Sequence, residues 1–412
     1  MGIIVHKYGG TSVGSIERIQ CVAQRVAKAV DEGCQCVVVV SAMGKSTDVL
    51  VDMAKQIAPY PSEREMDMLL ATGEQVSIAL LTMAFHQLGY DAVSLTGWQA
   101  GILTQPVHGR ARITGIDNER IISYLNEGKI VVVAGFQGMT EDGQITTLGR
   151  GGSDTTAVAL AASLKADLCE IFTDVTGVYS ADPRVVSRAR KLSSISYDEM
   201  LELANLGAGV LHPRAVECAK KYGVRLTVRS SFVEEEGTRV EEVSSMETGL
   251  VVRGVAHDED VARVTVIGMP SRVGSLSNLF MTLAENNINV DIIIQSSYDA
   301  EETNISFSVS TADLNKTLRV LAAHQEKLNF QSISHEADLA KVSIVGAGMI
   351  SNPGIAAQMF KELSDADIPI RMVSTSEIKV SCVIPKEFTL LAVNTLHTAF
   401  KLDVEEEAVV HG

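Results

Sequence analysis

Short, uninterrupted runs of apolar residues recur along the first half of this chain, and they constrain its fold more than any other feature. Residues 36–40 read CVVVV and residues 130–134 read IVVVA, with no alternation of polar and apolar side chains. Such runs are typical of strands that are buried on both faces of a parallel sheet. Residues 3–6, 92–95 and 169–173 have the same character. We therefore expect several buried parallel strands.

Segments with the spacing of amphipathic or buried helices lie between these runs. Residues 15–31 repeat apolar side chains at intervals of three and four, and residues 66–87 form one long apolar-rich segment. Strands that alternate with helices indicate an α/β domain with a mainly parallel sheet flanked by helices. The polar loops of such a domain gather at the carboxyl ends of the strands, where ligands bind.

A glycine-rich stretch, residues 146–156 (TTLGRGGSDTT), leads into an alanine- and leucine-rich helical segment. Its three glycines allow a tight turn and a close approach of the backbone to a ligand. We expect Ser153 or Asp154 to cap the helix, whose free N–H groups favour an anion. Arg150 adds a guanidinium suited to carboxylate or phosphate. Asp154 would repel a phosphate, so we expect it to orient a lysine or face a metal; an ordinary glycine loop before a capped helix is the alternative.

Size and composition narrow the class of protein. A chain of 412 residues predicts two or three domains. A formal net charge of −16 argues against nucleic acid or an anionic membrane surface as the main partner. Six cysteines without a C-x-x-C pair predict reduced thiols in a cytoplasm. We expect neither a signal peptide nor a membrane span, because no apolar run reaches the roughly 18 residues that a span needs.

The second half of the chain contains an internal repeat after an exposed acidic connection at residues 234–245. Residues 264–268 (VTVIG) resemble residues 342–346 (VSIVG), and Gly274 and Gly354 begin the helices that follow. Each unit continues as βαββα, so we expect two ferredoxin-like units. We expect domain boundaries at residues 1–245, 246–336 and 337–412. Each unit is small and should bury its sheet against the other unit or a partner chain.

Four loops carry an unusual combination of residues. They are KYGGTS at residues 7–12, SAMG at residues 41–44, GRGGSD at residues 149–154 and TDVTGVYSADPR at residues 173–184. Together with Glu74 and the repeat, they make the chain similar to the bacterial aspartate kinases over essentially its whole length. The resemblance implies a catalytic amino acid kinase domain followed by paired ACT domains. The implied reaction converts ATP and L-aspartate to 4-phospho-L-aspartate in the cytoplasm, on the route to lysine, threonine and methionine.

The residues suit this reaction, because phosphoryl transfer is mainly positioning and charge neutralisation. Lys7 is a point charge that can follow the moving phosphoryl group, and the resemblance assigns it stabilisation of the transition state. Asp154 would orient Lys7. No general base is needed, since the acceptor carboxylate is ionised near neutral pH. Arg150 suits the α-carboxylate of aspartate, and Glu74 suits its α-ammonium.

Weaker candidates complete the predicted catalytic site. For the substrate they are the hydroxyl side chains Ser41, Thr47 and Ser153. For ATP they are Lys7, Tyr8, Gly9, Gly10, Thr173, Asp174, Tyr179, Ser180, Ala181, Asp182, Pro183, Arg184, Gly209 and Val210. No cluster of carboxylates or histidines marks a protein metal site, so we expect Mg²⁺ to arrive with the nucleotide phosphates.

The resemblance implies effector pockets in the repeat. The first would involve Asn289, Val290, Asp291 and Gln295 with residues 271–276, and the second Ile355, Ala356, Pro369, Ile370, Ser376 and Glu377. The family often has Asp-x-Pro-Gly before the first helix, whereas this chain has SRVG at residues 271–274. Lysine, alone or with threonine, is the expected effector. We expect a homo-oligomer, or an oligomer with a short ACT-only subunit; Met246 sits where an internal start of such a subunit would fall.

Two other functions remain open at this point. The same fold could phosphorylate another small acid such as glutamate, from which only the width of the pocket would separate aspartate. Alternatively, the chain could be an amino-acid-binding regulator whose kinase half is inactive. The presence of Lys7, Arg150, Asp154 and Asp174 argues against the regulator.

Overall fold

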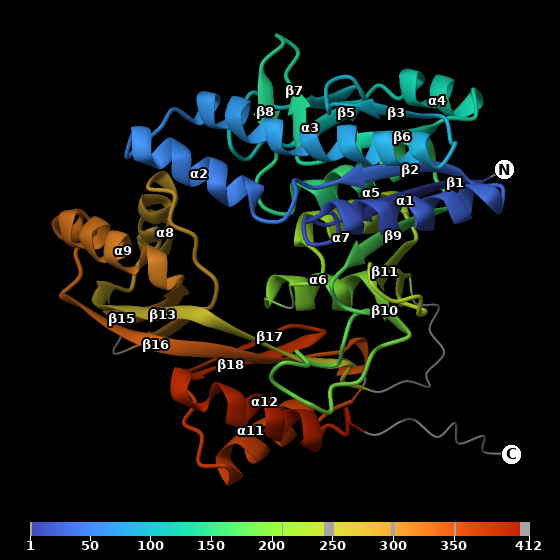
Figure 1. Ribbon diagram of the computed structural model, residues 1–412. Helices are drawn as coiled ribbons and strands as arrows, with labels where there is room; N and C mark the ends of the chain where they lie inside the picture. The colour runs from blue at the N-terminus through green and yellow to red at the C-terminus, as the bar shows by residue number, and fades with distance from the viewer. Residues whose placement is uncertain (1, 208, 243–250, 298–300, 350–351, 404–412) are drawn as a thin grey trace, which may run out of the picture. The chain divides into compact units, whose positions relative to one another are not determined.

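The computed structural model describes residues 2–207, 209–242, 251–297, 301–349 and 352–403 (Figure 1). Met246, the predicted start of a short subunit, lies outside the described residues. The chain divides into two compact units. The first comprises residues 1–178, 191–205 and 209–246, and the second comprises residues 179–190, 206–208 and 247–412. The chain therefore passes between the units more than once.

The first unit is built on an eight-stranded sheet with the order β10-β12-β11-β9-β1-β2-β6-β3. Its strands are β1 (Ile3–Tyr8), β2 (Gln35–Val40), β3 (Ala92–Leu95), β6 (Ile130–Ala134), β9 (Leu168–Thr173), β10 (Ser194–Ser196), β11 (Leu226–Ser230) and β12 (Thr238–Glu241). The six strands from β11 to β3 are parallel to their neighbours, and β12 runs antiparallel to β11. This arrangement confirms the predicted α/β class.

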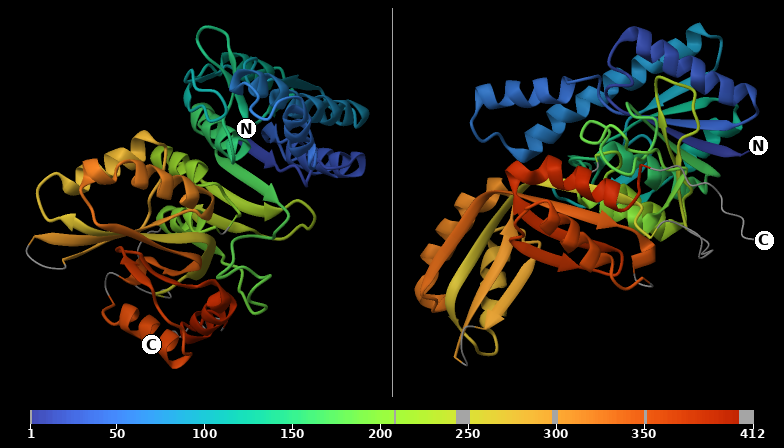
Figure 2. Two further views of the ribbon diagram at one scale, coloured as in Figure 1. Left: turned by 90° about the vertical axis from the view of Figure 1, so that its left-hand side faces the viewer. Right: turned by 90° about the horizontal axis from the view of Figure 1, so that it is seen from below.

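Helices flank this sheet (Figure 2). They are α1 (Ile16–Asp31), α2 (Ser46–Ile57), α3 (Glu63–Gln87), α4 (Glu119–Asn126), α5 (Gly152–Leu164), α6 (Tyr197–Asn205) and α7 (Pro213–Tyr222). Apolar side chains of α1 and α3 share one core with alternate residues of β1, β2 and β6, among them Tyr8, Val38 and Val132. Helix α5 is buried along most of its length and packs against β1, β2 and β9.

A second, four-stranded sheet with the order β5-β4-β7-β8 belongs to the same unit. It consists of β4 (Ile102–Thr104), β5 (Ile113–Ile116), β7 (Gln137–Met139) and β8 (Ile145–Thr147). The sequence analysis missed it, because strands of three or four residues are too short to show a period. Its strand β8 leads directly into the glycine-rich loop.

Helix α3 is long and apolar enough to cross a membrane by length and composition alone, which the sequence analysis did not foresee. In this fold it is a core helix, since Ile78, Leu81 and Phe85 pack into the core beneath the sheet. It also carries two buried carboxyl side chains, Asp67 and Glu74, which are 0% and 3% exposed. Glu74 lines the cavity described below as the candidate active site. Asp67 accepts a hydrogen bond from Thr147, which is close in the sequence to residues that line that cavity.

The second unit contains a six-stranded antiparallel sheet with the order β14-β15-β13-β16-β18-β17. Its strands are β13 (Gly254–Pro270), β14 (Ile293–Ser297), β15 (Glu302–Val309), β16 (Ser332–Val345), β17 (Met372–Thr375) and β18 (Lys379–Pro385). Its helices are α8 (Ser275–Glu285), α9 (Thr311–Ala323), α10 (Gln325–Leu328), α11 (Ile355–Asp365) and α12 (Thr389–Ala399), with short turns η1 (Ala347–Met349) and η2 (Lys386–Phe388). Each predicted repeat has its own apolar core.

The long strand β13 serves both repeats. Its pairing with β16 shifts register between Asp258 and Val261. Val264 and Val266 lie in the core of the first repeat, whereas Val255 lies in the core of the second. The predicted boundary at residue 246 assigned the start of this strand to the first repeat, and the structure differs there. Residues 179–190, inside the predicted catalytic domain of residues 1–245, also belong to the second unit. The boundary between the two repeats at residues 336 and 337 stays a prediction.

Candidate active site

A cavity of about 280 Å³ opens where β1 and β2 end and α5 begins. It is lined by Lys7, Gly10, Ser41, Ala42, Gly44, Thr47, Glu74, Phe136, Gly149, Arg150, Gly151, Gly152, Ser153 and Asp154. The lining includes every residue predicted to act in catalysis or to bind the acceptor substrate. These residues come from five separate segments of the chain, which parallel topology brings to one edge of the sheet.

Lys7 and Asp154 form an ion pair in this cavity. The distance from Lys7 Nζ to Asp154 Oδ1 is 2.5 Å, and each side chain is only 12% exposed. Lys7 lies near the end of β1, and Asp154 lies in the first turn of α5. This is the contact that the predicted orienting role of Asp154 requires. It also fixes a positive charge near the carboxyl end of β1.

The neighbouring residue His6 lies on the other face of β1, because successive side chains of a strand alternate. It is 2% exposed, and its Nε2 lies 3.0 Å from Glu170 Oε2 on β9. Burial alone would raise the pKa of Glu170, but the contacts with His6 and Arg229 outweigh it and lower this pKa to about 2. The cluster of His6, Glu170 and Arg229 lies on the face of β1 opposite to Lys7 and has a structural role.

Glu74 projects from α3 into the cavity, where no cationic side chain among the described residues forms an ion pair with it. Its Oε1 accepts a hydrogen bond from the Ala42 N–H at 3.1 Å. Its buried Oε2 has no hydrogen-bond partner among the described residues. Burial raises the pKa of the Glu74 carboxyl to about 7. A buried carboxylate oxygen without a partner costs free energy, so the site is prepared for a ligand that brings a donor or a positive charge.

The glycine-rich loop turns back on itself before α5. Gly149 and Gly151 have φ values of +76° and +70°, which favour glycine. A Cβ on Gly151 would lie 2.0 Å from the ring of His212, so no other residue fits there without displacement. Gly151 is also the N-cap of α5 and makes no side-chain cap. The expectation that Ser153 or Asp154 would cap the helix is therefore wrong, since both lie within its first turn.

Arg150 lies at the exposed tip of this loop, between the two left-handed glycines. The residues of the first turn of α5, Gly152, Ser153 and Asp154, line the same cavity. A guanidinium and the amino end of a helix thus border one side of the cavity, and Glu74 borders another. This distribution of charge suits a small molecule that carries both an anionic and a cationic group.

Two residues predicted to bind ATP have side chains that are committed elsewhere. Tyr8 is fully buried and stacks on Phe172, with 4.6 Å between the ring centroids. Burial raises the pKa of its phenol. Ser180 is also fully buried, with 2.9 Å from its Oγ to Nε2 of His397 on α12. Neither side chain is available to a nucleotide, which corrects the prediction for these two side chains.

The remaining predicted ATP residues divide between the units. In the first unit, Gly9 and Gly10 follow the end of β1, Thr173 is the last residue of β9, and Asp174 follows it. A Cβ on Gly10 would lie 2.8 Å from the Ala42 carbonyl oxygen, so glycine lets these loops approach. Residues 179–184 belong to the second unit. There Ala181 is part of the apolar core of the second repeat, and Asp182 accepts hydrogen bonds from the Arg184 guanidinium; Pro183 and Tyr179 flank them. Gly209 is exposed and Val210 is half-buried.

The structure adds site residues that the sequence analysis did not select. Phe136 has a left-handed backbone, with φ of +69°, and lines the cavity beside Gly152. It follows the end of β6, and its position at a strand end was the signal available in the sequence. Ala42 and Gly44 lie in the loop after β2, which was singled out as a motif, but the sequence assigned neither residue a role.

In the first repeat, a cavity of about 290 Å³ lies at the start of α8 and is lined by residues 270–276, Gln295, Thr303 and Ile305. This lining includes Gln295 and residues 271–276, all of which were predicted for the first effector pocket. Asn289 and Val290 precede β14, and Asp291 forms an ion pair of 2.5 Å with Lys341. These three residues are not part of that lining.

In the second repeat, the predicted effector residues have mixed environments. Ile355, Ala356 and Ile370 pack against the core of this repeat. Pro369, Ser376 and Glu377 are exposed. The backbone N–H of Ser376 donates a hydrogen bond to the Lys379 carbonyl oxygen at 2.8 Å. Their exposed side chains are accessible to a small ligand.

Sequence comparison assigns both halves of the chain to known families. Residues 2–230 match the amino acid kinase family, and residues 264–325 and 342–400 match the ACT domain. An aspartokinase of Bacillus sp. (strain MGA3) is 64% identical over 402 residues, which are 98% of each chain. Among solved structures, E. coli aspartokinase III in complex with aspartate and ADP matches 96% of this chain and 99% of its own, with a TM-score of 0.82 at 27% identity.

The same E. coli enzyme in complex with lysine and aspartate matches 97% of this chain and 99% of its own, with a TM-score of 0.75. Full-length similarity thus agrees with a kinase unit followed by a unit of paired ACT domains. The chain therefore belongs to the amino acid kinase family and, within it, to the ATP-dependent aspartokinases that carry ACT domains.

Proposed function

We propose that the chain transfers the γ-phosphoryl group of MgATP to the β-carboxylate of L-aspartate, with 4-phospho-L-aspartate and ADP as products. The observation that carries this proposal is one cavity that holds the Lys7–Asp154 ion pair together with Glu74 and Arg150. The solved E. coli relative contains aspartate and ADP. Aspartokinase activity is the function of this family, and the proposal assigns its steps to residues of this chain.

Glu74 and Arg150 hold opposite ends of the amino acid. The unpartnered Oε2 of Glu74 accepts the α-ammonium group, which restores a partner to a buried carboxylate. The Arg150 guanidinium and the first N–H groups of α5 bind the α-carboxylate. Ser41, Thr47 and Ser153 line the same cavity and offer hydroxyl donors. The β-carboxylate is then directed toward Lys7.

The reaction is an in-line displacement at the γ-phosphorus. An oxygen of the β-carboxylate forms the new bond to phosphorus, the bond from phosphorus to the bridging oxygen breaks, and ADP leaves. Lys7 neutralises charge on the transferring group, and Asp154 holds the ammonium in position. No proton is removed from the acceptor, because an aspartate side chain is ionised near neutral pH.

The nucleotide lies beside the ends of β1 and β9 in this proposal. Lys7, Gly9 and Gly10 approach the phosphates, and Thr173, Asp174, Gly209 and Val210 approach the nucleoside. Among the described residues, no group of three or more histidine, cysteine or carboxylate side chains is placed to hold a metal. We propose that Mg²⁺ arrives with the nucleotide phosphates as the substrate MgATP.

The second unit senses end products. The E. coli relative binds lysine together with aspartate, and we propose lysine, alone or with threonine, as effector here. The cavity at the start of α8 and the exposed Ser376 and Glu377 are the two candidate sites. We further propose that the enzyme acts in the cytoplasm as an oligomer joined through its ACT domains, with itself or with a short ACT-only subunit.

A coupled assay of ADP release tests the proposal. Purified protein is supplied with MgATP and with aspartate, glutamate or no acceptor. We expect turnover with aspartate only, and phosphorus NMR should detect an acyl phosphate. Faster turnover with glutamate would replace the acceptor, and ADP release that is independent of any acceptor would remove the kinase assignment.

A further inference from the structure

A buried carboxylate outside the catalytic cavity, Asp67 on α3, is tied to the segments that lead to Arg150. We infer that Asp67 is a positioning residue, which fixes the Arg150 loop so that Arg150 and Glu74 grip one amino acid at a set separation. The inference rests on the proposed function for the identity of that amino acid.

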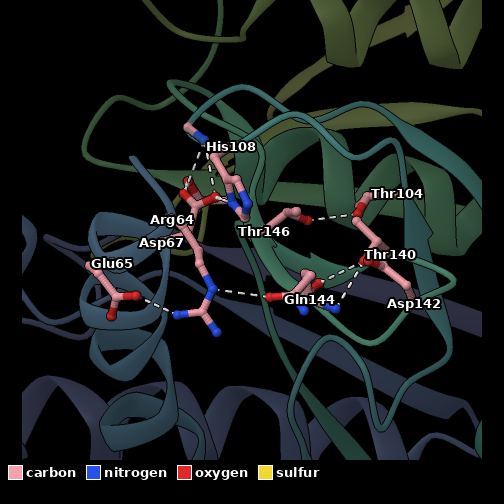
Figure 3. A network of polar contacts seen from close by, with 11 residues as sticks. Arg64, Glu65, Asp67, Thr104, His108, Thr140, Asp142, Gln144 and Thr146 are labelled. Carbon is pink, nitrogen blue, oxygen red and sulfur yellow. Dashed lines mark hydrogen bonds and ion pairs between the residues drawn. The ribbon is translucent and has the colours of Figure 1, made fainter. Parts of the chain in front are cut away.

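The side chain of Asp67 is fully buried and uses both of its oxygens. Oδ1 accepts a hydrogen bond from the Thr147 hydroxyl at 2.5 Å, and the Gly109 N–H lies 3.1 Å from each oxygen. Oδ2 lies 2.7 Å from Nδ1 of His108. Figure 3 shows the His108 ring directed at the Asp67 carboxyl group. Asp67 thereby joins α3 to two segments, residues 108–109 and the end of β8, that lie about 40 and 80 residues away in the sequence.

Its partners are the immediate supports of the glycine-rich loop. Thr147 is the last residue of β8, three positions before Arg150. Residues 108–111 press against the same place, since the Ala111 N–H donates to the Thr147 carbonyl oxygen at 2.9 Å. A Cβ on Gly149 would lie only 2.9 Å from the Gly109 carbonyl oxygen. Asp67 is therefore the common anchor of the strand end and of the strap, residues 108–111, that covers it.

Arg214 on α7 also holds the strand end and the strap in place. The Arg214 guanidinium on α7 donates to the carbonyl oxygens of Leu148 and Ala111, at 2.6 and 3.0 Å. Asp67 and Arg214 thus tie the same two segments from opposite helices. The loop that bears Arg150 begins at a point that is held on both sides.

Asp67 lies on the same helix, α3, as the proposed ammonium ligand Glu74. Glu74 lies seven residues further along α3, which is about two turns and close to the same face. Both side chains are buried. Helix α3 thus carries Glu74, which binds the α-ammonium group in the proposed mechanism. Through Asp67 it also fixes the position of Arg150, which binds the α-carboxylate. A displacement of about 1 Å in such a pair is enough to cost orders of magnitude in rate.

Removal of the Thr147–Asp67 hydrogen bond tests the inference. Thr147→Val removes the hydroxyl at nearly constant volume, Thr147→Ser keeps it, and Asp67→Asn removes the charge. Asp142→Asn is the matched control, because Asp142 is exposed and bonds to Thr140 at the turn between β7 and β8. Figure 3 shows this pair apart from Asp67 in the same network. KM for aspartate, KM for ATP and the melting temperature are measured for each protein.

We expect KM for aspartate to rise about tenfold or more in Thr147→Val and Asp67→Asn, with KM for ATP changed less than about twofold. Thr147→Ser and Asp142→Asn should resemble the wild type. The inference fails if folded Thr147→Val keeps the wild-type KM for aspartate, or if both KM values rise together. Thr147→Val decides the matter if Asp67→Asn does not fold. Failure of the proposed function is distinct, since wild type and Asp142→Asn would then show no aspartate-dependent turnover.

Discussion

Among individual residues, Lys7 and Asp154 have the largest expected effect on the reaction. Their ion pair fixes one positive charge where the phosphoryl group is transferred in the proposed mechanism. We expect Lys7→Ala to reduce kcat by about 10²–10³ through loss of a preorganised charge. Lys7→Arg should not restore it, because a planar guanidinium does not replace a point charge. Steady-state kinetics and thermal unfolding check this. Turnover near the wild-type rate in a folded Lys7→Ala protein would refute the mechanism.

The buried carboxyl of Glu74 predicts a pH dependence of substrate binding. Burial raises its pKa to about 7, so the free enzyme loses the charge that attracts an ammonium group as pH falls below that value. We expect kcat/KM for aspartate to fall below about pH 7, and Glu74→Gln to flatten this profile and raise KM for aspartate far more than KM for ATP. A pH profile that is unchanged in Glu74→Gln would assign the titration to another group.

The same group affects stability with a definite sign. Its pKa rises from 4.5 to about 7 on folding, so the folded state binds more protons than the unfolded state between these values. The unliganded protein should therefore lose stability as pH rises through this range. Glu74→Gln should lack that loss, which denaturant unfolding at pH 5 and pH 8 measures. Equal pH dependence in both proteins would contradict the prediction.

Strand alternation explains which residues of the amino-terminal motif the sequence could assign. Lys7 faces α5, whereas His6 and Tyr8 share the opposite face, and this follows from a period of two. Tyr8 was selected because it belongs to the motif, and the periodicity argued against it. Asp67 had no such signal, since its partners lie far away in the sequence and only the fold brings them together.

At the scale of elements, the turn into α5 depends on glycine at residue 151. Alanine there would have a strained left-handed backbone and a Cβ 2.0 Å from the His212 ring. Gly143 is a matched control, because its φ is +84° but nothing lies within 4 Å of an added Cβ. Gly143→Ala should lower the free energy of unfolding by about 1–2 kcal/mol. Gly151→Ala should lower it by more and should also raise KM for aspartate. Equal losses in denaturant unfolding would mean that the His212 contact relaxes freely.

The sequence predicted the elements of the main sheet well and those of the small sheet poorly. Runs such as residues 130–134 announce buried parallel strands by composition alone. The strands β4, β5, β7 and β8 contain three or four residues each and are defined by their partners. The long strand β13 was anticipated only in part, because a single strand that serves two cores has no distinct sequence pattern.

At the scale of the whole molecule, control by the second unit requires an effector that prefers one arrangement of the enzyme. We expect lysine, alone or with threonine, to inhibit, and Glu377→Ala to relieve inhibition with uninhibited kcat unchanged. A coupling of about 1–3 kcal/mol suffices, and aspartate must then weaken effector binding by the same factor. Activity and calorimetry with each effector check this. Full activity and no heat of binding at millimolar effector would leave the repeat as an assembly module.

The division into units could not be predicted from the order of residues, because a linear reading cuts the chain once. The sequence placed the catalytic domain at residues 1–245 as one block. In the structure, residues 179–190 belong to the second unit, where Ala181 and Val186 enter its core. Nothing in their composition distinguishes these residues from an ordinary surface loop.

That excursion sets a condition on the short ACT-only subunit proposed above, because a chain that starts at Met246 does not contain residues 179–190. A fragment that starts near residue 247 would lack Ala181 and Val186 and would expose the gap that they fill beside Val255 and Val342. It would also lack Ser180, leaving the buried His397 without its hydroxyl partner. Genetic transfer of the regulatory module to another enzyme would therefore need residues 179–190 supplied in trans, as in a protein rebuilt from complementary fragments.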